Sequence, residues 1–169
     1  DPAGFDLVQG SVDRGLWLAL LVPPEDAPDF APIVEAVRTT LGRSASGGPQ
    51  YLNVAISPKL SLPEFGEAAG QRAPLPHVWE LSAPDPGDPK GVAYLPLTVM
   101  ADSTNGLTAD GVIRLALPAK ESFFAPSNNV RDDVDAGTGD KPPRLDEQKK
   151  AGRLVAWLRL RPTTELDSL

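Results

Sequence analysis

The residues best suited to chemistry in this chain are carboxylates, and the largest group lies in one acidic segment. The aspartates and glycines of that segment are Asp132, Asp133, Asp135, Gly137, Gly139 and Asp140. A calcium ion takes several oxygen ligands on a turning backbone, so the segment could hold one. The spacing differs from that of an EF-hand, and no bidentate glutamate stands where that motif has one. We therefore expect a solvated acidic loop over residues 130–140, and whether it binds a cation stays open.

Paired carboxylates elsewhere are candidates for acid–base catalysis. Glu64 with Glu67, and Asp102 with Asp110, could form a glycosidase pair, which needs a set separation across a cleft. Beside prolines and glycines such carboxylates more often cap elements and form turns. His77 is the single histidine, and without a serine or cysteine elbow a surface or turn role is favoured. We expect no catalytic, cofactor-binding or metal-binding residue, and hence no enzyme.

Aromatic side chains are candidates for a recognition surface. The tryptophans and tyrosines of the chain are Trp17, Tyr51, Trp79, Tyr94 and Trp157. They could stack on sugar rings, or they could pack on sheet faces, as strand aromatics more often do. Trp157 alternates with Arg159 and Arg161, a composition that suits a protein interface, with an intramolecular stack as the alternative. Phe123 and Phe124 either anchor their own loop or dock on a neighbour. The candidate partner-binding set therefore has five members: Phe123, Phe124, Trp157, Arg159 and Arg161.

The composition excludes several classes of function. The chain has 169 residues and a net charge of −7, whereas nucleic-acid binding needs a basic surface. It has no cysteine for a disulfide, and one histidine cannot make a multi-histidine metal site. The longest apolar run, residues 16–22, is too short to span a bilayer. Because the chain begins with Asp1 rather than methionine, we expect it to be a piece of a larger protein.

Apolar residues with a period of two predict a mainly β fold. The strands are expected over residues 16–22, 51–57, 78–82, 95–99, 111–118 and 154–161. The unbroken apolar run 16–22 indicates a central strand covered on both faces. Helical spacing predicts one short amphipathic helix between Asp29 and Gly42, and a further helical turn is expected near residues 145–150. With a long loop over residues 119–146, we expect one antiparallel, jelly-roll-like β-sandwich domain over residues 1–169.

The stretch from Leu95 to Arg161 carries a resemblance to a known family. A strand leads into Asp102-Ser103-Thr104-Asn105-Gly106-Leu107-Thr108-Ala109-Asp110-Gly111-Val112-Ile113-Arg114-Leu115-Ala116-Leu117-Pro118, then a long loop, then Trp157-Leu158-Arg159-Leu160-Arg161. This order resembles the baseplate J-like family, and more closely the large baseplate assembly proteins of phage-tail-like contractile injection systems. Residues 14–20 and 78–81 resemble the strands that precede the motif in that family.

The resemblance implies a structural, non-enzymatic module that makes protein–protein contacts during baseplate wedge assembly. Its partners would be wedge, hub or spike proteins, with no nucleic acid and no membrane involved. The module would lie in the cytoplasm during assembly and then in the tail-like particle. A carbohydrate-binding β-sandwich is the alternative.

The corner within the motif has its own physical explanation. Asp102 and Thr104 can hydrogen-bond the amides of their own turn, as short polar side chains do at strand ends. The pair Asn105-Gly106 supplies positive φ for a tight reversal, and Gly111 restarts the ladder. Leu107 is expected to tuck the corner onto the core. These properties predict a structural turn rather than a reactive site.

Overall fold

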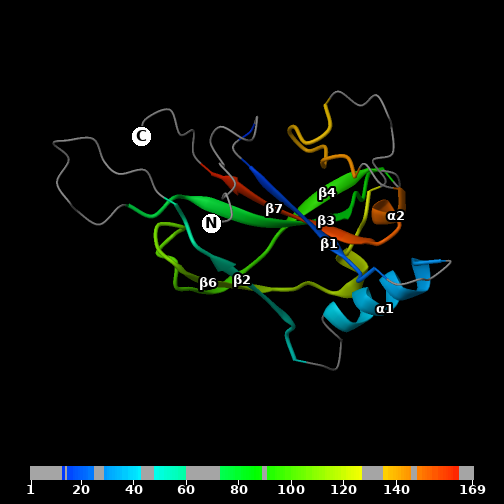
Figure 1. The fold of residues 1–169 in the computed structure, drawn as a ribbon, viewed down its shortest axis with the longest axis horizontal. Helices are drawn as coiled ribbons and strands as arrows, with labels where there is room; N and C mark the ends of the chain where they lie inside the picture. The colour runs from blue at the N-terminus through cyan, green and yellow to red at the C-terminus, as the bar shows by residue number, and fades with distance from the viewer. Residues whose placement is uncertain are drawn as a thin grey trace.

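The computed structural model describes residues 13, 15–24, 29–42, 48–59, 73–88, 91–126, 135–145 and 148–163, with the side chains of residues 148 and 149 excepted. The described part is mainly β, with two antiparallel sheets and one amphipathic helix of more than a single turn, as the sequence predicts (Figure 1). One sheet has four strands in the order β1-β7-β3-β4, and the other has three in the order β2-β6-β5.

The four-stranded sheet is built around the last strand of the chain. β7 (Leu154–Pro162) pairs with β1 (Leu16–Leu21) on one side and with β3 (His77–Pro84) on the other, and β4 (Val92–Pro96) completes the sheet. Every residue of β7 from 154 to 160 is buried. The predicted central position of β1 is wrong, because β1 is an edge strand.

The three-stranded sheet comprises β2 (Tyr51–Ile56), β6 (Gly111–Ala116) and β5 (Val99–Asp102). The single strand predicted over residues 95–99 is wrong, because the chain there passes from one sheet to the other. Leu97 N–H still donates to the carbonyl of Trp79 on β3, while the next carbonyl, that of Thr98, accepts from Ala116 N–H on β6. The alternation of apolar residues stays the same whether or not a strand changes sheets.

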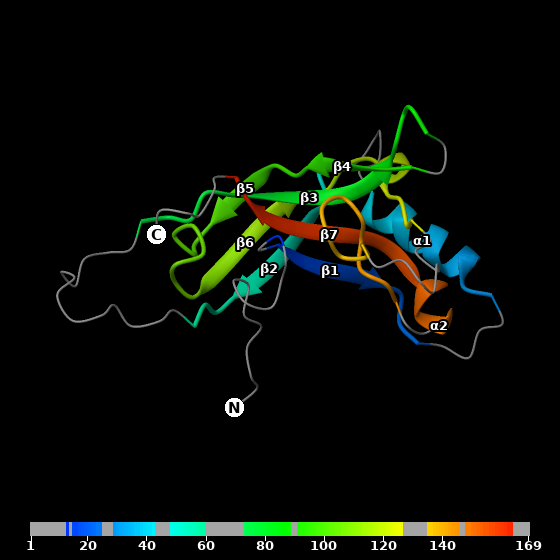
Figure 2. The same ribbon diagram turned by 90° about the horizontal axis from the view of Figure 1, so that it is seen from above.

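Helix α1 (Ala31–Leu41) closes one end of the structure, as Figures 1 and 2 show. Its first amide, on Ala31, donates to the Asp29 carboxylate, and Gly42 N–H donates to the Arg38 carbonyl at its end. The predicted end at Gly42 is confirmed, but the N-cap is Phe30, without a side-chain cap hydrogen bond, rather than the expected Asp29. Arg38 reaches β7, where its Nε and Nη2 donate to the Val155 carbonyl at 3.1 and 2.8 Å. Val155 is the extra residue of a bulge opposite Leu20 and Leu21.

One hydrophobic core joins both sheets and the helix. Trp79, Leu81, Ile113 and Leu115 are fully buried in it, with Leu158 almost so. The inward face of α1 also packs against this cluster. A short 3-10 helix, η1 (Lys120–Ser122), follows the three-stranded sheet, and a single helical turn, α2 (Gln148–Ala151), precedes β7 close to its predicted place.

Candidate functional site

The corner that follows β5 is held by the side chains of Asp102 and Thr104, as the sequence predicts. The Asp102 carboxylate accepts from Thr104 N–H (2.7 Å), Thr104 Oγ1 (2.6 Å) and Gly106 N–H (3.1 Å). Thr104 is fully buried, and its hydroxyl oxygen accepts from Leu107 N–H at 2.9 Å. Burial alone would raise the pKa of Asp102, but the hydrogen bonds from Thr104 and Gly106 outweigh it and hold that pKa below its ordinary value.

Three consecutive residues of the corner have left-handed backbone. Their φ angles are 51° at Asn105, 64° at Gly106 and 67° at Leu107. The first two confirm the prediction, and the third is a strained conformation for a leucine. Leu107 is buried in the core cluster, so the expected anchoring of the corner is confirmed. Gly111, at the start of β6, faces Ser103 so closely that a Cβ would lie 2.7 Å from its backbone. The corner is a tight turn closed by its own side chains.

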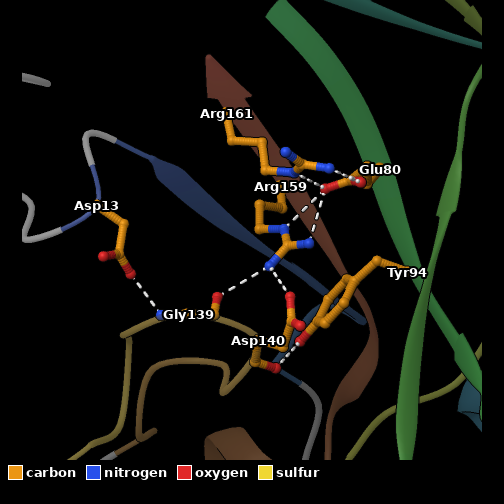
Figure 3. A network of polar contacts seen from close by, with 7 residues as sticks. All are labelled: Asp13, Glu80, Tyr94, Gly139, Asp140, Arg159 and Arg161. Carbon is orange, nitrogen blue, oxygen red and sulfur yellow. Dashed lines mark hydrogen bonds and ion pairs between the residues drawn. The ribbon is translucent and has the colours of Figure 1, made fainter. Parts of the chain in front are cut away.

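The arginines of β7 form an ion-pair network on the outer face of the four-stranded sheet (Figure 3). Arg159 lies opposite Glu80 of β3, and its Nη2 and Nε lie 2.8 and 2.9 Å from Glu80 Oε2. Arg161 adds a second cation, with Nε 2.9 Å from Oε2 and Nη2 3.0 Å from Oε1. The Glu80 side chain is 4% exposed and that of Arg159 7%, so the Glu80–Arg159 pair is buried. Hydrogen bonds to Glu80 raise the pKa of Arg161.

A segment from residue 135 to 145, here called the strap, covers this network. Arg159 Nη1 donates to the Gly139 carbonyl (2.9 Å) and to Asp140 Oδ1 (2.8 Å), and the Tyr94 hydroxyl donates to the Asp140 carbonyl at 2.8 Å (Figure 3). The Gly139 amide also donates to the Asp13 carboxylate. The strap therefore lies on the sheet face that the sequence suggested as a partner-binding surface.

Aromatic rings complete the same cluster. The Arg159 guanidinium lies 3.9 Å from the Tyr94 ring centroid and 5.2 Å from that of Trp17. Trp17 meets Tyr94 and Trp157 edge to face, at 5.5 and 6.1 Å between centroids. Trp157 is 4% exposed and Arg159 5%, whereas the Arg161 side chain is 47% exposed. Because Trp17 packs here while its neighbours Leu16 and Leu18 pack on the core, β1 is apolar on both faces although it is an edge strand.

Neither of the two adjacent phenylalanines is exposed. Phe123 is buried in the core cluster, and Phe124 is half-buried. The backbone of Phe124 is bound at both groups, because its N–H donates to the Ser82 carbonyl and its carbonyl accepts from the Ser82 hydroxyl. That hydroxyl oxygen also accepts from Trp157 N–H at 2.8 Å. Ser82 thus ties the start of the 119–146 segment to β3 and β7.

Of the other candidate residues, His77 lies near enough to Asp102 to add to the lowering of the pKa of that carboxyl. His77 begins β3, and its ring Nδ1 lies 2.7 Å from the Leu75 carbonyl. Asp110 accepts a hydrogen bond from Ser57 at 2.9 Å, whereas the Asp102 carboxylate is bound within its own corner. Glu64, Glu67, Asp132 and Asp133 lie outside the described residues. Within the described ranges, no three His, Asp or Glu side chains are grouped to hold a metal ion.

A surface that the sequence reasoning missed lies on the three-stranded sheet. We call it the open face, and its seven exposed residues are Tyr51, Asn53, Ala55, Met100, Ala101, Val112 and Arg114. Their register follows from the pairing: Asn53 and Ala101 flank Arg114, and Ala55 is opposite Val112. A bulge makes Met100 an extra residue of β5 beside Arg114. The sequence shows these residues on the strand faces opposite the core-facing leucines, valines and isoleucines, but it does not say which sheet face stays uncovered.

The open face has the composition of a protein interface. Met100 is 52% exposed, Val112 44% and Tyr51 39%, which are unusually exposed for large apolar side chains. Arg114 is the one charged residue of the set, and it is fixed by a bond to Asn53 Oδ1 (3.0 Å) and lies 5.5 Å from the Tyr51 ring centroid. Interface centres are enriched in tyrosine, methionine and arginine and depleted in acidic side chains.

No protein-family model, curated protein or solved structure matches this chain. In the described part of the chain, no helix combines the length and the apolar composition needed to cross a membrane.

Proposed function

We propose that this chain is a structural, non-enzymatic module of a phage-tail-like baseplate, and that its open face contacts a neighbouring wedge, hub or spike protein. The observation that carries the proposal is the uncovered apolar face of β2, β6 and β5 around the single cation Arg114. The partner surface is apolar, with a carboxylate that pairs with Arg114. The module joins the particle during assembly in the cytoplasm.

Two further features support this proposal. The motif over residues 102–118 resembles baseplate assembly proteins, and the polar side chains of its corner bind groups of the corner itself. The strands of the open face are anchored from behind, since Leu52, Val54 and Ile113 on their other side pack in the core. A surface whose strands are already held by core packing loses little conformational entropy on binding, which suits a protein whose work is assembly.

A carbohydrate-binding role has less support. Sugar-stacking platforms need exposed aromatic rings, and of the five tryptophans and tyrosines only Tyr51 is exposed. Trp17, Trp157 and Tyr94 instead pack around Arg159, and Trp79 is fully buried in the core.

The test is co-assembly with the sheath-, tube- and spike-like products of neighbouring genes. We expect Val112→Glu and Met100→Glu to abolish incorporation of the chain into purified particles, because each places a carboxylate in the apolar face. Thr39→Glu, on the exposed face of α1, is the matched control: it adds the same charge away from the sheet and keeps incorporation. Circular dichroism verifies that all three variants fold.

Two results would contradict the proposal. Normal incorporation of both open-face variants would exclude the open face as the contact surface. The absence of sheath, tube and spike genes beside this one, with no particle that contains the chain, would remove the baseplate assignment itself.

A further inference from the structure

The free edge of β1 has a hydrogen-bonding pattern that follows from the strands beside it. In an antiparallel ladder each residue directs its N–H and C=O to one neighbour, and successive residues alternate. Trp157 N–H donates to Ser82 on β3, so the backbone N–H and C=O groups of Trp157 and Arg159 point toward β3. Their partners on β1 are Ala19 and Trp17, whose backbone N–H and C=O groups therefore point away from β7.

These two outward residues present an unpaired strand edge. Among the described residues, none outside β7 bonds to the backbone of Trp17 or Ala19. The strand Leu16–Leu21 has no charge, proline or glycine, and it is apolar on both faces. Natural sheets usually blunt such an edge with a charge, a proline or a bulge.

The opposite side of the two sheets carries those protections. In Figure 2, β1 and β2 lie along one side and β4 and β5 along the other. β4 contains Pro96, while β5 is bulged at Met100 and ends at Asp102. β2 is also uncharged, but its outer face is wet and carries Asn53 in the middle. β1 is the edge at which an added strand gains apolar contacts on both faces.

We propose that β1 pairs antiparallel with β1 of a second copy of this chain, which joins two four-stranded sheets into one. The strand is self-complementary about Leu18. Trp17 lies opposite Ala19 of the second copy, and Ala19 opposite its Trp17, each pair exchanging two backbone hydrogen bonds. On the core side the two Leu18 side chains meet as a close, non-hydrogen-bonded pair. This inference is independent of the baseplate proposal.

Charge sets how this dimer responds to salt. The paired strands carry no charge, but each chain carries a net charge of −7, so two copies repel at long range. At 0.1 M ionic strength, the interaction between exposed charges more than about 10 Å apart is largely screened. The dimer therefore tightens as ionic strength rises.

The experiment combines sedimentation with amide hydrogen exchange on the full chain. Sedimentation from micromolar to millimolar concentration should show a monomer–dimer equilibrium that shifts to dimer with added sodium chloride. At low concentration the amides of Trp17 and Ala19 exchange rapidly while those of Leu18 and Leu20, bonded to β7, are protected. At high concentration Trp17 and Ala19 become protected as well. This measurement needs no variant, so it holds even if a substitution in β1 prevents folding.

Proline variants locate the contact. Ala19→Pro removes an outward N–H and should abolish the dimer. Ala55→Pro is the matched control, because Leu117 N–H donates to the Gln50 carbonyl and so Ala55 also points to a free edge, that of β2. It should keep the dimer. A monomer at every concentration, a dimer whose Trp17 and Ala19 amides stay unprotected, or a dimer lost only in Ala55→Pro would each overturn the proposal.

Discussion

Replacing Arg159 by methionine tests whether the buried ion-pair network stabilises the fold. The change keeps the aliphatic volume and removes the guanidinium, which bonds to Glu80, the Gly139 carbonyl and Asp140. Breaking a buried pair on one side typically costs about 3–5 kcal/mol. Glu80 keeps a second cation, because Arg161 holds both of its oxygens. The Asp140 side chain is 81% exposed, so its pair with Arg159 adds little.

We therefore expect Arg159→Met to lower the free energy of unfolding by about 3 kcal/mol, the lower end of that range. Urea unfolding followed by tryptophan fluorescence measures this loss, and Trp17 and Trp157 report on the site directly. Arg161→Met is the matched control on the same strand face. Its side chain is 47% exposed, so its loss should cost only about 1 kcal/mol.

The two variants together decide the question. If Arg159→Met costs no more than Arg161→Met, burial does not govern this network and the reasoning is refuted. A further check is the double variant Glu80→Gln with Arg159→Met. It should cost less than the sum of the two single changes, because each single change leaves a buried group without its partner.

The corner after β5 supplies three more predictions. Thr104→Val should cost about 1–3 kcal/mol in urea unfolding, since the buried Leu107 amide loses its acceptor. Gly106→Ala should cost about 1–3 kcal/mol by the same assay, because φ is +64° and the new Cβ would lie 2.5 Å from Pro74 Cβ; full stability would disprove the close approach. The pKa of Asp102 is lowered in the folded state, so its stabilisation is present above its ordinary pKa of 3.8 and is lost as pH falls through the folded value. Asp102→Asn should therefore flatten the acid limb of stability against pH, and an unchanged acid limb would count against this linkage.

Local sequence was sufficient for the elements whose contacts are local. The side chain of Asp102 binds groups two and four residues ahead, and Thr104 binds the amide three ahead. In helix α1 the Asp29 carboxylate likewise binds the amide two residues ahead, and the helix ends before Gly42. Such bonds form wherever the short segment folds, so residue type and spacing alone predict them. The mainly β composition of the fold follows in the same way from the period of the apolar residues.

The assignment of each sheet face to water, core or another segment was decided only by the tertiary structure. Arg159 is covered because Glu80, 79 residues earlier, lies beside it and because the strap crosses the same face. The edge position of β1 and the change of sheet at Leu97 and Thr98 also depend on pairings between distant segments. Alternation fixes that a strand has two different faces, but burial is set by what packs on each. For that reason the sequence indicated the Trp157 and Arg159 face, whereas the structure leaves uncovered the face around Arg114 and the edge of β1.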